Sequence, residues 1–454
     1  MTTLLRVLID EMRWKDYRIF IDQYQRAARS LAEKVRDPSL ATHTVSDRTF
    51  ERWYAGRVTP QNEARRILAH LFMRPINELL AEAPSKAPIA MGPRMTGEFS
   101  ATHTTIRAAP GADQYEMGRN AAMAARRAMD FAMGAEQKRA GQETLDYLHT
   151  EVRRIAEIHL RVPVGTILDD LTYIQDTTFR LLESGRVKPS QSRDLFLLAA
   201  IQSGMLAKAG HDLGDPQSAM MQARTASVCA DQAEHQALRA WVKGLQSAIS
   251  YWANRPEDSL HYARQGVEIS TELHSSVTVW LAAQEARAAA LLGDAKTVRA
   301  AIRRAEELRE RTRPDDLDDL GGNFFFPQIR QTFFGIEAEV LLGDNDVALV
   351  RRAEDAVREL KDANDPYWAF AAEAGCQSNL ALARLQMADL EGTAEAVRPV
   401  LDLPPNRRNA GIISSVRRVE TSLRSGPSRN SVMARELCEK IAAFSRNRPL
   451  ALRR

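Results

Sequence analysis

The chain has 454 residues, with 62 Lys and Arg against 59 Asp and Glu, which gives a formal net charge of +3. This length exceeds what one hydrophobic core usually serves, so we expect two or more domains. The near balance of charge excludes an overall field that attracts nucleic acid or membranes, so any such attraction must be local. Three distant cysteines, Cys229, Cys376 and Cys438, indicate neither a disulfide framework nor a zinc site.

The composition predicts an all-α protein. Ala, Leu, Arg and Glu are abundant, and long β-branched or alternating runs are nearly absent. No apolar run approaches membrane-spanning length and the first residues do not form a signal peptide, so we expect a cytoplasmic protein that does not bind membranes. The motifs H-E-x-x-H, G-x-S-x-G, C-x-x-C and a glycine-rich phosphate loop are absent, so we expect no enzymatic activity, cofactor or metal.

Residues 1–82 predict a bundle of short helices, and VSDRTFERWYAGRVTP from Val45 is its most informative stretch. If Ser46 is the N-cap, Phe50 and Trp53 share a buried face and the charged residues between them lie outside. Gly56 ends this helix. We expect Thr59 to cap the next helix, with Pro60 in its first position.

A short, capped helix of this kind suits the recognition helix of a helix-turn-helix, which places its first turn near base edges in the major groove. Arginines can donate to guanine or phosphate, and hydroxyl and amide groups can donate to phosphate. The candidate DNA-binding residues are Thr44, Ser46, Asp47, Arg48, Thr49, Arg52, Arg57 and Gln61. The alternative is an ordinary small helical domain whose polar face is only solvated.

A tether and a repeat array follow. Residues 83–113 are rich in Pro, Gly, Ser and Thr and have no apolar period, which indicates a flexible linker. Residues 114–454 carry a recurring phrase of the type L-G-D, from Leu213, Leu292 and Leu342, with related phrases from Asn254 and Met387. The spacing of about 40 to 50 residues is typical of an α-solenoid of tetratricopeptide-like hairpins, in which Gly ends one helix and Asp caps the next.

The pattern S-x-x-x-F-x-R-W-x-x-G, from Ser46 to Gly56, resembles the core of XRE-type helix-turn-helix regulators. The chain is similar to actinobacterial regulators that join such a domain to a C-terminal tetratricopeptide-like array. The resemblance continues through SRDLFLLAAIQSGMLAKAGHDLGDPQSAM, RAWVKGLQSAISYWANRPEDSLHYA and DDLGGNFFFPQ, and it covers nearly the whole chain. It implies a transcriptional regulator that binds double-stranded DNA through residues 46–54, with two-fold homodimers as the expected form.

The repeat array has a candidate effector site. In LRAWVKGLQSAISYW, the residues Trp241, Leu245, Ala248 and Trp252 predict a buried stripe. A second face is polar and suits the carboxylate or backbone of a peptide or small molecule; its candidate ligand-binding residues are Arg239, Lys243, Gln246, Gln284 and Arg287. The alternative, which is the commoner case for charged helix faces, is a solvated outer surface.

The aromatic run after Gly321 and the acids near Ser46 each allow two interpretations. The aromatic run GGNFFFP from Gly321, with Phe333 and Phe334 after it, either lines an apolar pocket or dimer contact or, as is more usual for aromatic residues, anchors a helix in the core. The acids Asp47 and Glu51 lie where DNA phosphates would approach. They motivate an alternative function, a protein–protein adaptor on the same scaffold that does not bind DNA.

Overall fold

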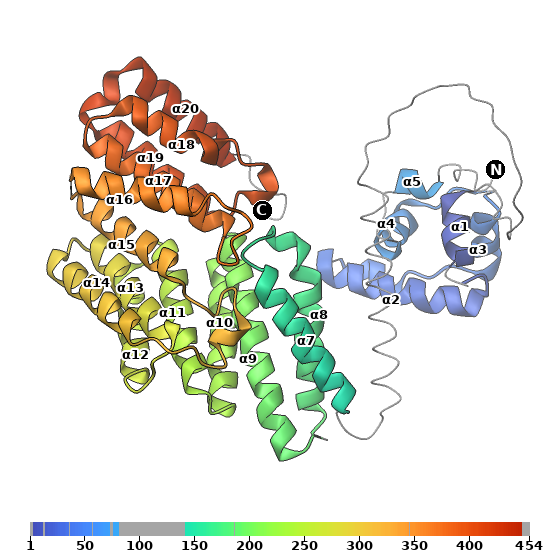
Figure 1. The fold of residues 1–454 in the computed structure, drawn as a ribbon. Coiled ribbons are helices and arrows are strands. Elements are labelled where there is room, and N and C mark those ends of the chain that lie inside the picture. Colours follow the sequence, from blue (N-terminus) through green and yellow to red (C-terminus); the bar gives the residue numbers. More distant parts are fainter. Residues whose placement is uncertain are drawn as a thin grey trace, which may run out of the picture. The chain divides into compact units, whose positions relative to one another are not determined.

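The computed structural model describes residues 3–11, 14–35, 37–56, 58–72, 76–80, 141–185, 187–344 and 346–446. These ranges form α-helices and short 3-10 helices and no β-strand (Figure 1), which confirms the all-α prediction. The chain divides into two compact units, residues 1–108 and 109–454. The predicted linker, 83–113, lies outside the described residues. In the part of the chain that is described, every helix is too short or too polar to cross a bilayer.

The N-terminal unit is a small bundle built around its longest helix, α2. Aromatic and aliphatic side chains from all its α-helices form one core, because each helix is apolar on one face only. α2 packs against η1 and α4, and α1 packs against α3 and α5. The elements are α1 (Leu4–Glu11), α2 (Tyr17–Val35), η1 (Pro38–Thr42), α3 (Asp47–Tyr54), α4 (Asn62–Leu71) and α5 (Ile76–Leu80).

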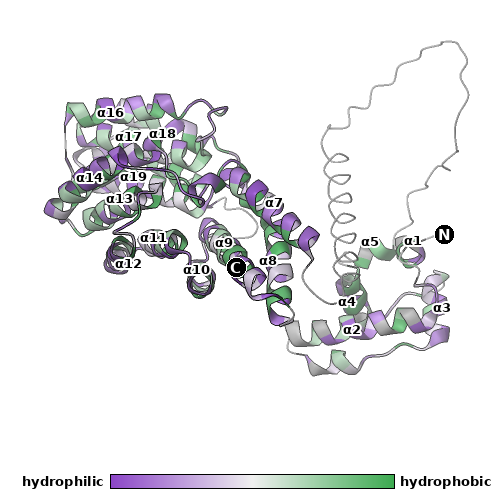
Figure 2. Ribbon diagram, turned by 60° about the horizontal axis from the view of Figure 1, so that its bottom comes forward, coloured by the Kyte–Doolittle hydropathy of each residue, from purple (hydrophilic) through white to green (hydrophobic). Residues whose placement is uncertain are grey.

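The second unit is a succession of helices in two layers. Neighbours pack as pairs, such as α9 with α10, α11 with α12 and α13 with α14, while α9, α11, α13, α15, α17 and α19 also contact one another in turn. The helices that contact one another in turn, such as α11, α13 and α17, are buried on nearly every side. Their pair partners, such as α12, α14 and α16, bury only one stripe. Figure 2 shows hydrophilic and hydrophobic residues alternating along α14.

The helices of the second unit have the following bounds: α7 (Gln142–Ile158), η2 (Val164–Thr166), α8 (Leu168–Glu183), α9 (Pro189–Asp212), α10 (Pro216–Gln232), α11 (Gln236–Trp252), α12 (Pro256–Ile269), α13 (Ser276–Leu291), α14 (Ala295–Glu310), η3 (Asp318–Leu320), α15 (Gln328–Leu342), α16 (Val347–Glu359), α17 (Phe370–Gln386), α18 (Leu390–Leu401), η4 (Pro405–Arg407), α19 (Ala410–Ser425), η5 (Pro427–Asn430) and α20 (Val432–Arg446).

The recurring sequence phrases lie at the tight turns inside the pairs. Each turn has one residue with positive φ, which lets the chain reverse after a helix end: Gly214, Asn254, Gly293, Gly343 and Ala388. As predicted, Asp215, Asp294 and Asp389 cap the following helices through their side chains. Two turns differ from the prediction. Arg255 is the N-cap after Asn254, without a side-chain cap, and Asp346 rather than Asp344 caps α16.

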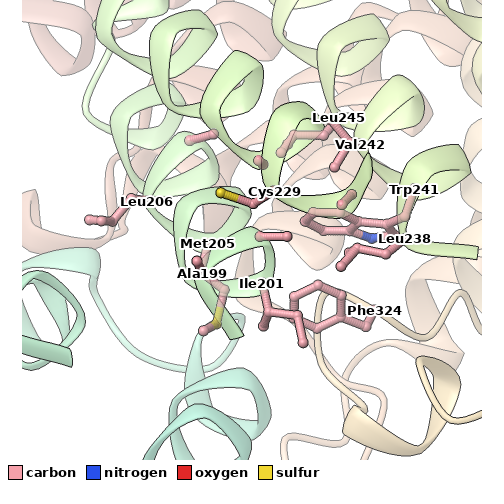
Figure 3. Packing of buried hydrophobic residues seen from close by; sticks show 14 of the residues in the cluster. Ala199, Ile201, Met205, Leu206, Cys229, Leu238, Trp241, Val242, Leu245 and Phe324 are labelled. Atoms are coloured by element: carbon pink, nitrogen blue, oxygen red, sulfur yellow. The ribbon is translucent and has the colours of Figure 1, made fainter. Parts of the chain in front are cut away.

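Glycines in the inner helices make room for large rings from the next helix. A Cβ on Gly204 of α9 would collide with the Trp241 indole of α11, and a Cβ on Gly244 of α11 would collide with the Trp280 indole of α13. The same contact therefore recurs one helix pair further along the chain. Trp241 also lies near Phe324 (Figure 3), with ring centroids 4.5 Å apart. These rings lie at the border between the apolar core and the cavity described below.

Candidate nucleic-acid interface and ligand cavity

Helix α3 is an amphipathic helix on an aromatic support. Ser46 is its N-cap, as predicted: its Oγ accepts a hydrogen bond from the Thr49 backbone N (3.3 Å) and lies 2.9 Å from Thr49 Oγ1. Phe50 and Trp53 are buried, which was also predicted. Phe50 stacks on Phe20 of α2 with ring centroids 4.3 Å apart. One face of α3 is thus anchored, and the opposite face remains available to a partner.

The chain segment leading into α3 is held in the same way. The Tyr17 hydroxyl donates to the Val45 carbonyl oxygen (2.6 Å), and the Tyr24 hydroxyl lies 3.0 Å from His43 Nδ1. At the other end of α3, the Tyr54 hydroxyl donates to Asp10 Oδ1 (2.5 Å). Anchors at both ends fix the direction of the helix, which a recognition surface requires.

The structure places most of the predicted DNA-binding residues on the outside of this bundle. Those that are exposed are Thr44, Ser46, Asp47, Arg48, Arg52 and Gln61, while Thr49 is half-buried. Arg57 lies outside the described residues. The exposed group extends from the segment before α3, across α3, to the residue that precedes α4.

The exposed charges of α3 are free of one another. The side chains of Arg48 and Arg52 make no ion pair or hydrogen bond with any residue the structure describes, and the same holds for the carboxylates of Asp47 and Glu51. Two guanidinium groups are therefore available to external acceptors. The two carboxylates on the same helix reduce the local positive potential around these arginines.

The start of α4 differs from the prediction. Its N-cap is Gln61, which makes no side-chain cap hydrogen bond, and the helix begins at Asn62 rather than at Pro60. Pro60 is buried, and its carbonyl oxygen accepts a hydrogen bond from Arg65 Nε (2.9 Å). These contacts hold the backbone extended through Gln61, so Thr59 does not act as the cap.

The predicted polar strip of the second unit does not form. Gln246 is buried at 4% exposure because its side of α11 is covered by neighbouring helices. Arg239 instead pairs with Asp231 (Nε to Oδ1, 2.9 Å), and the Lys243 ammonium lies 5.7 Å from the Tyr262 ring centroid. Neither a common ligand surface nor a solvated face describes all five predicted residues. Only Gln284 and Arg287, both buried, line a cavity.

That cavity, of about 160 Å³, lies among α9, α11, α13, α15, α17, α19 and the loop before α15. The residues predicted as the buried stripe of α11, from Trp241 to Trp252, line it. So does most of the predicted aromatic run, whose members Phe324, Phe326 and Phe333 are also buried in the core. The aromatic wall consists of Trp241, Trp252, Trp280, Phe324, Phe326, Phe333 and Phe334.

A buried ionic network supports one side of the cavity. Arg287 Nε lies 2.7 Å from Glu337 Oε2, in a geometry that is not aligned for a hydrogen bond. Glu337 Oε1 accepts hydrogen bonds from the Tyr251 hydroxyl (2.8 Å) and Arg418 Nη1 (2.7 Å). Burial raises the pKa of Glu337, but the two guanidiniums outweigh it, so the net pKa lies below the usual value. Glu337 is thus a buried, ionised carboxylate.

The Arg287 guanidinium also lies between two rings. Its carbon is 4.1 Å from the Tyr251 ring centroid and 4.0 Å from that of Phe334. Sequence periodicity could not identify this arrangement, because the two rings and the carboxylate that Arg287 contacts lie on α11 and α15. A buried arginine in an otherwise apolar helix was the available signal, since such a residue requires a buried acceptor.

A second polar cluster lies where α9 ends. Lys208 pairs with Asp212, which also accepts a hydrogen bond from Asn409 Nδ2 (3.2 Å). His159 and His211 lie beside this pair, and burial lowers the pKa of both imidazoles to about 4. Neither nitrogen of His159 makes a hydrogen bond within the described ranges. Both histidines are therefore neutral near pH 7.

These histidines predict a loss of stability in mild acid. Their folded-state pKa of about 4 lies below the unfolded value of 6.5, so the unfolded chain binds more protons between these limits. The contribution of these two neutral histidines to the free energy of unfolding is therefore complete above about pH 6.5, and it falls as the pH drops toward 4. We expect the free energy of unfolding to fall by about 1 kcal/mol per histidine between pH 6.5 and 5.5. Urea unfolding at both pH values, followed by circular dichroism, measures this change.

His159→Leu provides the matched test because it removes one of the two titrations. We expect this variant to lose about half of the pH dependence over the same interval. The control is His261→Asn, at an exposed histidine of α12, which should leave the pH dependence unchanged. Equal slopes for His159→Leu and the wild type would contradict the assignment.

Among the residues that are described, no three or more His, Cys, Asp or Glu side chains come together in a way that could hold a metal ion. The three cysteines are buried and unbonded. No protein-family model and no curated protein matches this chain.

Proposed function

We propose that the chain is a DNA-binding transcriptional regulator of the XRE type. In this proposal the N-terminal unit is a helix-turn-helix domain that reads an operator through α3, and the second unit is a tetratricopeptide-like solenoid that senses an effector or dimerises. The observation that carries the proposal is the exposed face of α3: Arg48 and Arg52 have no partner among the described residues, while Phe50 and Trp53 hold the helix from below.

The chemistry of the exposed group suits a duplex. An α-helix fits the major groove, where arginine recognises guanine through its O6 and N7 acceptors. Hydroxyl and amide groups such as those of Thr44, Ser46 and Gln61 suit phosphate contacts, which set the register but carry no sequence information. Since the carboxylates of Asp47 and Glu51 repel DNA phosphates, we expect modest affinity for random DNA. Specific base contacts should then contribute a large part of the affinity for the operator.

Arg48→Ala and Arg52→Ala test this function. We expect each to weaken operator binding by about fivefold to 150-fold, because a base contact contributes about 1 to 3 kcal/mol. The operator is first recovered by passing genomic fragments over the immobilised protein at low salt, and affinity is then measured by fluorescence anisotropy over a salt series. A variant that loses a phosphate contact has a salt slope lower by about one, while a variant that loses a base contact keeps the slope.

The control is Arg299→Ala, which removes the same charge from an exposed position of α14 in the other unit. It should bind the operator as the wild type does. If the wild type at micromolar concentration retains no genomic fragment at low salt, the regulator proposal is wrong. The adaptor alternative is motivated by the exposed acids Asp47 and Glu51. It then gains support if Arg52→Ala captures a protein partner as well as the wild type does.

A further inference from the structure

Arg330 of α15 is a cation in the cavity wall that lacks a carboxylate partner among the described residues. Its Nη2 donates to the backbone oxygens of Gly322 (2.7 Å) and Phe325. Its Nε is buried and makes no hydrogen bond within the described part of the chain. Nη1 makes none with the described residues either, and unlike Nε it is not fully enclosed. Arg330 is half-buried and is one of the residues that line the cavity, so a ligand in the cavity can contact it.

The charges around the cavity leave an excess of cations. Lys208, Arg287 and Arg330 line it, and Arg418 joins the network behind it, whereas the carboxylates of this region are Asp212 and Glu337. His211, the remaining titratable group in the wall, is neutral at pH 7. A partly buried charge without a counter-charge is unfavourable, and an incoming anion relieves this penalty.

The electrostatic surroundings of Arg330 agree with this excess. Burial, and then the neighbouring Arg309, lower the pKa of Arg330 to about 9. Both effects disfavour its positive charge, and a bound carboxylate would oppose them. Arg287 differs from Arg330 in this respect, since Glu337 already compensates it.

The remaining walls select an apolar body of limited size. Aromatic rings from α11, α13, α15 and the loop before α15 face the space. Its volume of about 160 Å³ is close to that of an engineered apolar cavity, about 150 Å³, that binds benzene. One aromatic ring or a short branched chain therefore fills it. A long peptide cannot be enclosed in this volume.

We propose that this cavity binds a small organic monocarboxylate, with the carboxylate on Arg330 and an aromatic or branched aliphatic body against the aromatic wall. The inference deepens the sensing role and rests on the proposed function for its biological meaning. The Nη1 group supplies a charge-assisted hydrogen bond, which is stronger than a neutral one.

Isothermal titration calorimetry on the full chain tests the proposal with phenylacetate and its neutral isostere phenylacetamide. We expect phenylacetate to bind about tenfold more tightly or better, as a charge-assisted contact requires. 4-Methylpentanoate should also bind, since its branched body fits the same space. This comparison needs no substitution, so it does not depend on the folding of a variant.

Arg330→Met should reduce the affinity for phenylacetate to that for phenylacetamide and leave the affinity for phenylacetamide unchanged. Arg330→Lys keeps the charge and should restore part of the preference. The control Arg299→Met removes an exposed arginine from the same unit and should bind both compounds as the wild type does. Circular dichroism of each variant establishes that the fold is retained.

Equal affinity for the acid and the amide in the wild type would overturn the role of Arg330. Lack of binding of both acids at millimolar concentration, or binding of an extended peptide in their place, would overturn the ligand class. Retention of genomic DNA is measured on the same preparations. A protein that binds phenylacetate and retains no DNA contradicts only the regulator function, and the reverse outcome contradicts only the carboxylate site.

Discussion

Glu337→Gln is expected to lower the free energy of unfolding of the second unit by about 3 to 5 kcal/mol, because removing one partner of a buried ion pair leaves the other charge uncompensated. Glu337 is 1% exposed and Arg287 2% exposed. Glutamine keeps the size of the side chain and can still accept from the Tyr251 hydroxyl, so the loss reports the charge rather than a cavity. Urea denaturation followed by circular dichroism measures it.

Glu339→Gln is the matched control on the same helix. Glu339 Oε2 lies 2.7 Å from Arg352 Nη2, the same distance that separates Glu337 from its arginines, but the Arg352 side chain is 52% exposed. A solvated pair of this kind contributes about 0 to 1 kcal/mol. Similar losses for the two variants would show that burial does not decide the strength of the Glu337 network.

The comparison of Glu337 and Glu339 shows what the sequence could predict. The two residues lie two positions apart in one predicted helix, and nothing in the local sequence pattern distinguishes them. The capped helix at Ser46, with Phe50 and Trp53 inward, was predictable because caps and helical periodicity depend on residues only a few positions apart. The partners of Glu337, in contrast, lie about 50 to 90 positions away, so only the tertiary structure reveals them.

The cavity was only partly predictable for the same reason. Periodicity placed Trp241 and Trp252 on one face of α11, but it could not show that a cavity lies across from them. In α13, burial on nearly every side removes the amphipathic signal, so Gln284 and Arg287 could not be assigned to a solvated or an enclosed surface. Arg330 follows an aromatic run, and its lack of an acidic partner depends on side chains from other helices.

Gly322→Ala is expected to lower the free energy of unfolding of the second unit by about 3 to 5 kcal/mol, because it adds backbone strain and overpacking together. Gly322 has φ of +52°, and a Cβ there would collide with the Ala156 carbonyl oxygen of α7. Backbone atoms of a helix cannot yield as a flexible side chain can. The loop must therefore move, which strains the bonds from Arg330 to the Gly322 oxygen and from Trp241 Nε1 to the Asn323 oxygen (3.0 Å).

Gly343→Ala separates these two causes. Gly343 has φ of +81° in the left-handed region, but a Cβ there meets no atom within 4 Å among the described residues, so the variant should lose only about 1 to 2 kcal/mol. The difference between the variants, measured by urea unfolding, is the contribution of close approach between the loop and α7. Equal losses would mean that this loop has another way to pack. Because the same loop carries Phe324 and supports Arg330, Gly322→Ala should also weaken phenylacetate binding, whereas Gly343→Ala should not.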